Sequence, residues 1–130
     1  MANITKENIA RNASCNAITG QLDQSGYYAT GHLSIYGNDS SSSRLTWHVL
    51  SNPAFGTAVD GTAAAYLIYD ATVLRDGTAT TFAFENRDGS AAWRGLVSIN
   101  GHGGALQLEN INLYLASTVA ISSAFYIVPA

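Results

Sequence analysis

Residues 31–50 read GHLSIYGNDSSSSRLTWHVL, and two segments of this stretch alternate between apolar and more polar side chains. In the first segment Leu33 and Ile35 occupy every second position. In the second segment the alternating apolar residues are Leu45, Trp47 and Val49. A period of two is typical of strands that bury one face. We therefore predict two strands joined by a polar loop at residues 37–43. The side chains predicted to face outward are His32, Ser34, Tyr36, Arg44, Thr46 and His48.

The same period continues through the rest of the chain. Phe82 and Phe84 share one face of a predicted strand, and Trp93 and Val97 share a face of the next. Asp-Gly pairs begin at residues 60, 76 and 88, and such pairs are typical of tight turns between strands. About eight short strands at regular spacing favour an all-β fold. We predict an antiparallel β-sandwich, with a jelly roll as one arrangement of it.

The N-terminal region has a helical period instead. Between Lys6 and Leu22 the apolar residues at helical spacing are Ile9, Ala13, Ala17, Ile18 and Leu22. Thr5 is placed to cap this helix, and Gly26 is placed to end it. The apolar stripe is narrow and rich in alanine, so we expect the helix to pack through it against a partner. The chain is thus divided into an N-terminal helix or arm, residues 1–26, and a β-sandwich domain, residues 27–130.

The composition restricts the classes of partner. The chain has 130 residues, of which 47% are apolar and only 12% charged, with a formal net charge of −3. Nucleic acid and membranes are not expected partners, because the six Lys and Arg residues are scattered and no apolar run could span a bilayer. The single cysteine, Cys15, fits synthesis in a reducing compartment. A weakly charged surface loses little hydration energy when another protein covers it, which favours an assembly.

No catalytic motif is visible in the sequence. His32, His48 and His102 lack the neighbouring second histidine that metal sites often use, so we interpret them as surface or interface imidazoles. The glycines after His102 resemble the oxyanion loop of esterases, but the G-x-S-x-G motif that such enzymes need is absent from the sequence. We therefore expect no enzyme and no catalytic, cofactor-binding or metal-binding residues.

Residues 50–56 read LSNPAFG, a predicted turn that presents a lone aromatic side chain, Phe55, and residues 60–65 read DGTAAA. This stretch resembles small virion proteins encoded in the structural gene clusters of tailed phages. The resemblance covers nearly the whole chain in short segments, and it departs at residues 40–43 and 66–75. The matching segments are residues 9–22, 31–36, 52–56, 82–89, 96–100 and 121–129.

The resemblance implies a structural role, with decoration (cementing) of the phage head preferred over a tail-associated role. It implies the major capsid protein as a partner and the capsid surface of the virion as the location, after synthesis in the host bacterial cytoplasm. We also expect self-association, with a closed trimer preferred over a dimer. The candidate interface residues are Ile9, Ala13, Ile18, Tyr27, Tyr28, Tyr36 and Tyr114.

The alternative is a carbohydrate-binding sandwich, either lectin-like or a receptor-binding protein of the tail. Tyrosines at outward positions of strands can stack on sugar rings, and the loops at residues 37–43 and 100–104 are polar. We prefer the interface interpretation, because tyrosines on sandwich strands more often form cross-strand pairs or interface anchors.

Overall fold

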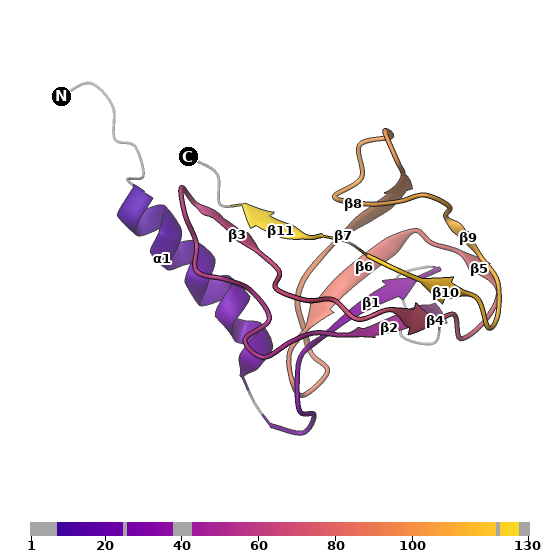
Figure 1. Ribbon diagram of the computed structural model, residues 1–130, viewed down its shortest axis with the longest axis horizontal. Coiled ribbons are helices and arrows are strands. Elements are labelled where there is room, and N and C mark those ends of the chain that lie inside the picture. Colours follow the sequence, from indigo (N-terminus) through magenta and orange to yellow (C-terminus); the bar gives the residue numbers. More distant parts are fainter. Residues whose placement is uncertain (1–7, 25, 38–42, 122, 128–130) are drawn as a thin grey trace.

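The computed structural model describes residues 8–24, 26–37, 43–121 and 123–127, and it is mostly β-structure with one N-terminal helix (Figure 1). The predicted cap Thr5 and most of the polar loop at residues 37–43 lie outside the described residues. The elements are α1 (Asn8–Thr19), the short 3₁₀ helix η1 (Gly20–Asp23), β1 (His32–Tyr36), β2 (Arg44–Val49), β3 (Thr62–Ala64), β4 (Ala71–Thr72), β5 (Gly77–Thr78), β6 (Thr81–Glu85), β7 (Ala91–Ile99), β8 (Leu106–Leu108), β9 (Asn112–Leu113), β10 (Thr118–Val119) and β11 (Phe125–Ile127).

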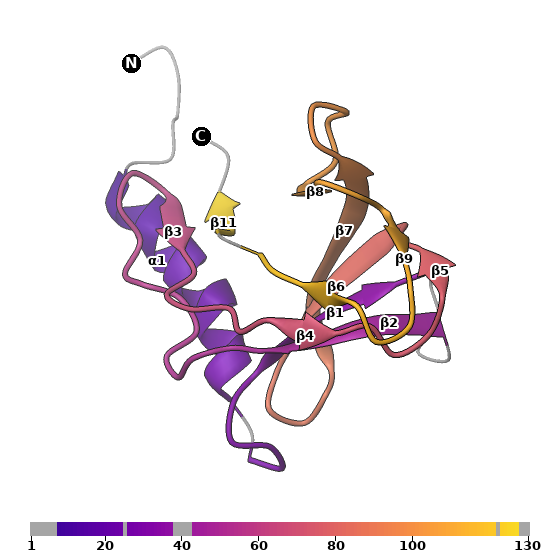
Figure 2. The same cartoon turned by 45° about the vertical axis from the view of Figure 1, so that its right-hand side comes forward.

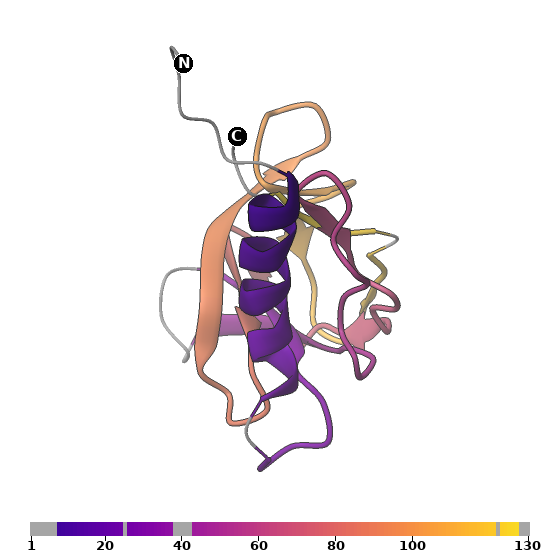
Figure 3. The same cartoon turned by 90° about the vertical axis from the view of Figure 1, so that its left-hand side faces the viewer.

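Five strands form the main sheet, which is curled and has the order β2-β1-β6-β7-β8 (Figure 2). On its inner face Leu33 and Ile35 lie opposite Phe84 and Phe82, and all four side chains are buried. This confirms the inward positions predicted for β1 and β6. The other described strands form the pairs β4–β10, β3–β11 and β5–β9. Figure 3 shows the main sheet on one side of the molecule and the pairs β4–β10 and β3–β11 on the other. Residues of the main sheet and Ala63 of β3 belong to one hydrophobic core.

One pairing differs from the predicted antiparallel arrangement, because β7 and β8 run parallel. Residues 100–105 turn the chain back and then forward again, and Gly101 and Gly103 in this loop have positive φ angles of 85° and 84°. Glycine adopts such angles without the steric cost that a Cβ would cause. The described residues hold eleven strands instead of about eight, because the elements opposite the main sheet are only two or three residues long.

The inward and outward faces predicted for β2 are confirmed at Leu45 and Arg44 and are wrong from Thr46 onward. Tyr36 pairs with Arg44 and Ile35 pairs with Thr46, so Leu45 is an extra residue in β2. Such a bulge shifts which side chains face each side of a sheet. Thr46 and His48 therefore lie on the same face as Leu33 and Ile35 and are fully buried, while Val49 is exposed. His32 is also buried, so neither strand histidine is a surface imidazole.

Phe55 belongs to the core and is not presented at a turn, as the sequence suggested. Its side chain is 6% exposed, and its ring makes edge contacts with the rings of Phe84 (5.5 Å) and Trp93 (5.7 Å). The reason is that the main chain after Pro53 is held against α1. That attachment turns Phe55 toward the inner face of the main sheet.

The packed face of the helical region matches the predicted stripe only at its end, because Leu22 is buried but the earlier residues of the stripe are not. Cys15 and Leu22 are buried in the core, whereas Ile9 is 85% exposed and Ala13 and Ala17 are also exposed. The helix ends at Thr19 and continues as the 3₁₀ turn η1, so Gly26 does not end it. Burial raises the pKa of the Cys15 thiol, which donates a hydrogen bond to the carbonyl of Tyr126 (3.5 Å).

Polar side chains of the helical region explain this orientation. Asn12 accepts a hydrogen bond from the N–H of Gly61 (2.7 Å), and Asn16 accepts one from the N–H of Ala58 (2.9 Å). Asp23 accepts a third from the N–H of Ala54 (3.0 Å). Some main-chain N–H groups of residues 54–61 thus donate hydrogen bonds to side chains of α1 and η1. In a sheet, such groups would bond to a neighbouring strand. The predicted boundary at residue 26 therefore separates a helix from strands that share one core with it.

The three Asp-Gly pairs have different roles. Asp60 and Gly61 form the predicted two-residue hairpin turn, with φ angles of 52° and 75°, and Gly89 also lies in a turn. The prediction for residues 76–77 is wrong, because Gly77 begins β5 and the Asp76 carboxylate accepts the N–H of Leu115 (2.7 Å). A Cβ on Gly77 would lie 2.8 Å from Cδ2 of Leu45, so glycine is needed there for close packing.

Candidate functional site

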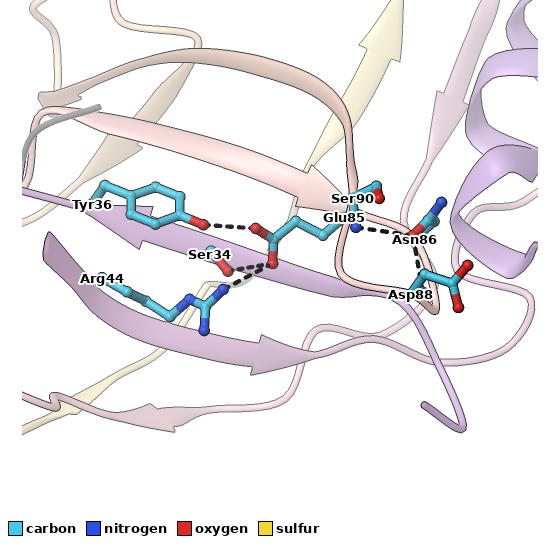
Figure 4. A network of polar contacts seen from close by, with 7 residues as sticks. All are labelled: Ser34, Tyr36, Arg44, Glu85, Asn86, Asp88 and Ser90. Carbon is cyan, nitrogen blue, oxygen red and sulfur yellow. Dashed lines mark hydrogen bonds and ion pairs between the residues drawn. The ribbon is translucent and has the colours of Figure 1, made fainter. Parts of the chain in front are cut away.

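A buried carboxylate network occupies the outer face of the main sheet. Glu85, at the end of β6, is 3% exposed and lies on the same face as Ser34 and Tyr36 of β1. The hydroxyls of Ser34 and Tyr36 each donate a hydrogen bond of 2.6 Å to the Glu85 carboxylate, one to each oxygen. The Arg44 guanidinium lies 3.6 Å from the same carboxylate (Figure 4). The charge is therefore both paired and hydrogen-bonded, as burial requires.

The turn after Glu85 is held by Asn86, whose side-chain oxygen accepts the N–H groups of Asp88 (2.9 Å) and Ser90 (3.0 Å) (Figure 4). This is a local side-chain turn that fixes where β7 begins. It keeps β6 and β7 in register below the network and offers no reactive group to a substrate.

An aromatic cluster continues the outer face toward β2. The His32 ring stacks on the Trp47 ring, with centroids 3.8 Å apart and planes 12° apart, and Tyr28 meets both rings edge-on. The Arg44 guanidinium lies 5.4 Å from the centroid of the Trp47 ring. Burial lowers the pKa of His32, against the opposing effect of Glu85. The stacked and edge-on rings therefore cover one another over this part of the sheet.

His48 lies in the core, where its Nδ1 is 2.8 Å from the carbonyl oxygen of Tyr69. Its Nε2 is buried and has no hydrogen-bond partner. Burial lowers the pKa of His48, and the effect exceeds the opposing ones of the Tyr69 carbonyl and of Asp70. The imidazole is therefore held neutral, with its Nδ1–H donating to Tyr69.

The two lowered histidine pKa values predict that acid destabilises the fold. The folded state binds fewer protons than the unfolded state, whose histidines titrate near about 6.5. Stability should therefore fall as the pH drops below about 6.5, by up to about 1.4 kcal/mol per pH unit for each histidine. Urea unfolding at several pH values measures this slope. The variant His48→Asn keeps a donor for Tyr69 and should show a shallower slope, whereas an unchanged slope would contradict the role of His48.

A groove of about 760 Å³ opens between β8 and the C-terminal segment of the chain. Phe82, Phe84 and Trp93 contribute aromatic rings to its lining, and the Trp93 ring also contacts the Tyr126 ring at 4.8 Å. Arg94 and Glu109 are the charged residues of the lining, so the groove is formally neutral. Polar and apolar side chains contribute about equally to its exposed lining, and its size is typical of binding sites for small molecules or peptide segments.

The walls of this groove are strand edges. Among the strands that the structure describes, β8 pairs only with β7, and β11 pairs only with β3. The N–H of Ala65 donates to the carbonyl of Ala124, so alternation in the antiparallel ladder points the main-chain groups of Phe125 and Ile127 away from β3. An open strand edge of this kind is a template for pairing with another chain. The groove is therefore suited to an added extended segment.

A second groove, of about 680 Å³, adjoins the first through Leu108, Glu109 and Ala120. It combines the Tyr114 ring with the side chains of Asn110 and Asn112 beside Glu109. An aromatic face thus lies next to two amides and a carboxylate in this groove.

The predicted interface residues do not form one surface. Tyr27, at 80% exposure, meets Tyr28 edge-on at 4.8 Å, and Tyr114 lies apart in the second groove. Ile9 and Ala13 are exposed on α1 and Ile18 is half-buried, whereas Tyr36 is buried and bonded to Glu85. Sequence reasoning missed Phe125 and Ile127, which are 61% and 63% exposed. Their alternation predicts a strand, but a period of two does not tell which of the two faces is exposed.

The described part of the chain contains neither a metal-binding cluster nor a membrane-spanning helix. No group of three or more His, Cys, Asp or Glu side chains there is arranged to hold a metal ion. No helix in residues 8–24 or in the later described ranges has the length and apolar character needed to cross a membrane. Comparison with protein-family models, with curated proteins and with solved structures finds no match to this chain.

Proposed function

We propose that this protein is a structural component that decorates and stabilises a phage capsid by self-association and by docking onto the major capsid protein. The observation that carries the proposal is the open edge of β11, where Phe125 and Ile127 expose their side chains beside the first groove. Other large apolar side chains, such as Leu115 and Tyr66, are exposed on a chain with few charges. Exposed apolar surface of this kind is typical of protein contact sites.

The specific assignment to a capsid rests on the resemblance of residues 50–65 to small phage virion proteins, and the alternative location is the phage tail. Docking by strand addition supports a cementing role, because main-chain hydrogen bonds provide affinity and alternate side-chain pockets provide specificity. Several weak contacts on a repetitive shell add by avidity. A closed trimer remains the preferred oligomer, with a dimer second. We also propose that the fold is a β-sandwich, with the main sheet as one layer and the short strand pairs opposite it as the other.

Substitution of Phe125 tests the docking edge. Phe125→Ser should convert the oligomer to monomers or weaken association at least about tenfold, which is the loss expected for one buried aromatic anchor. Light scattering of the eluting protein measures the oligomer mass. The matched control is Leu96→Ser, because Leu96 is 67% exposed on the outer face of β7, away from the groove. Equal association of both variants and the wild type would contradict the assignment of this edge.

Carbohydrate binding is the second candidate, and the lining of the second groove favours it. Tyr114 offers an aromatic face and Asn110, Asn112 and Glu109 offer hydrogen-bonding groups, the combination that binds sugar rings. A glycan array distinguishes the two functions: saturable binding that Tyr114→Ala abolishes would favour the lectin function, and a flat array would exclude it.

A further inference from the structure

The loop between β7 and β8 contains the one Asn-Gly pair in the sequence, Asn100-Gly101, whereas the other nine asparagines precede residues with a Cβ. Both residues are exposed. Gly101 has a positive φ of 85°, and a Cβ built on it would meet nothing within 4 Å, so the tip of the loop is open. The pair therefore combines a glycine nitrogen that no side chain of its own residue shields with a side-chain amide one residue before it.

We propose that Asn100-Gly101 is a site of spontaneous deamidation, and that Gln107 sets its rate. In this reaction the main-chain nitrogen of Gly101 attacks Cγ of Asn100 and forms a new N–Cγ bond. The side-chain amide nitrogen leaves as ammonia and takes the proton of the Gly101 N–H. Water then adds to the cyclic imide and breaks one of its two C–N bonds. Breakage at Cγ gives aspartate, and breakage at the main-chain carbonyl gives isoaspartate.

Gln107 restrains the attacking nitrogen. The Gly101 N–H donates to Oε1 of Gln107 (3.0 Å), and Nε2 of the same side chain donates to the carbonyl of Gly104 (3.2 Å). The nitrogen of Gly101 can attack only when it loses its proton. The hydrogen bond to the Gln107 oxygen stabilises the protonated N–H and therefore disfavours this loss. The hydrogen bond must therefore break before the ring can close. Two main-chain hydrogen bonds nearby, from the N–H of Asn100 to the carbonyl of Leu108 (2.9 Å) and from the N–H of His102 to the carbonyl of Ile99 (3.1 Å), leave the nitrogen of Gly101 untouched.

Deamidation would change the docking groove, an effect that rests on the proposed function. Asn100 lines the groove together with Glu109. A carboxylate at residue 100 would make the neutral lining negative, and isoaspartate would also insert a main-chain carbon next to the bond with Leu108. Modified copies should then accept an uncharged strand less well than fresh copies.

The test is timed incubation of the purified chain in neutral buffer at physiological temperature, followed by peptide mass spectrometry and isoaspartate detection. The peptide with Asn100 should gain the amide-to-acid mass change before any other, and exposed Asn110 is the internal control. Gln107→Ala should accelerate the reaction by about fivefold, the factor for loss of one ordinary hydrogen bond. Gln107→Glu keeps an acceptor for Gly101 and should therefore react no faster than the wild type.

Each outcome decides one part of the proposal. Asn100 reacting no faster than Asn110 would overturn the site itself. A Gln107→Ala rate equal to wild type, with circular dichroism showing an intact fold, would overturn the role of Gln107. Neither result depends on a partner, so both are separate from failure of the proposed docking function.

Discussion

Replacing Glu85 with alanine is expected to lower the free energy of unfolding by about 3–5 kcal/mol, the usual cost of removing one partner of a buried ion pair. The substitution leaves the hydroxyls of Ser34 and Tyr36 without their acceptor and the Arg44 guanidinium without its counter-charge. Because small domains are stable by only about 5–15 kcal/mol, this loss is a large part of the total. Urea unfolding followed by circular dichroism measures it.

Two controls separate the network from a general effect of removing charge. Glu85→Gln keeps the shape and one acceptor oxygen, so it should cost less than Glu85→Ala. Glu109→Ala removes an exposed carboxylate at the groove and should change stability by no more than about 0.5 kcal/mol. A Glu85→Ala protein as stable as the wild type would show that the network does not form.

The second large effect is expected for Phe55→Ala, which should lower the free energy of unfolding by about 3–5 kcal/mol. Its ring is buried against Phe84 and Trp93, so truncation leaves a cavity between α1 and the main sheet. The control is Leu115→Ala, because Leu115 is exposed and its side chain can be removed at a cost within about 0.5 kcal/mol. If Phe55 were presented at a surface turn, both variants would lower the free energy of unfolding by the same small amount. That result would contradict the burial of Phe55 against Phe84 and Trp93.

Local patterning predicted the strands of the main sheet but not the faces of all of them. The alternation in β1 and β6 identified Leu33, Ile35, Phe82 and Phe84 as inward residues. The alternation in β2 gave the opposite face from Thr46 onward, because one extra residue at Leu45 shifts the period. A bulge depends on pairing with the neighbouring strand, and such pairing is not encoded in the segment itself.

The helix was predicted correctly from the local spacing of its apolar residues. Its orientation was predicted wrongly, because hydrogen bonds to a distant segment decide it. Its apolar stripe through Ile9 and Ala13 is thin, so hydrophobic burial does not decide which face packs. Three acceptors at Asn12, Asn16 and Asp23 decide it, because the N–H groups of residues 54–61 need partners. Asparagines on a helix carry no local sign of a partner, and only the tertiary fold shows what they bind.

The candidate site was the part least accessible to sequence reasoning. The network at Glu85 joins residues of β1, β2 and β6 that are up to 51 positions apart, and none of them belongs to a motif. The groove depends on two strand edges being left open, which is a property of the topology. Tyr36 shows the difference most clearly: it was expected at an interface and instead lies buried as a hydrogen-bond donor to Glu85.

The most direct test of the proposed structural role is immunogold electron microscopy of phage particles from the source culture, with antibody raised against the recombinant chain. Gold distributed over the heads is the predicted result, and it would place the protein on the capsid surface. Gold confined to the tails would contradict the decoration role, and particles without any gold would contradict a place in the virion altogether.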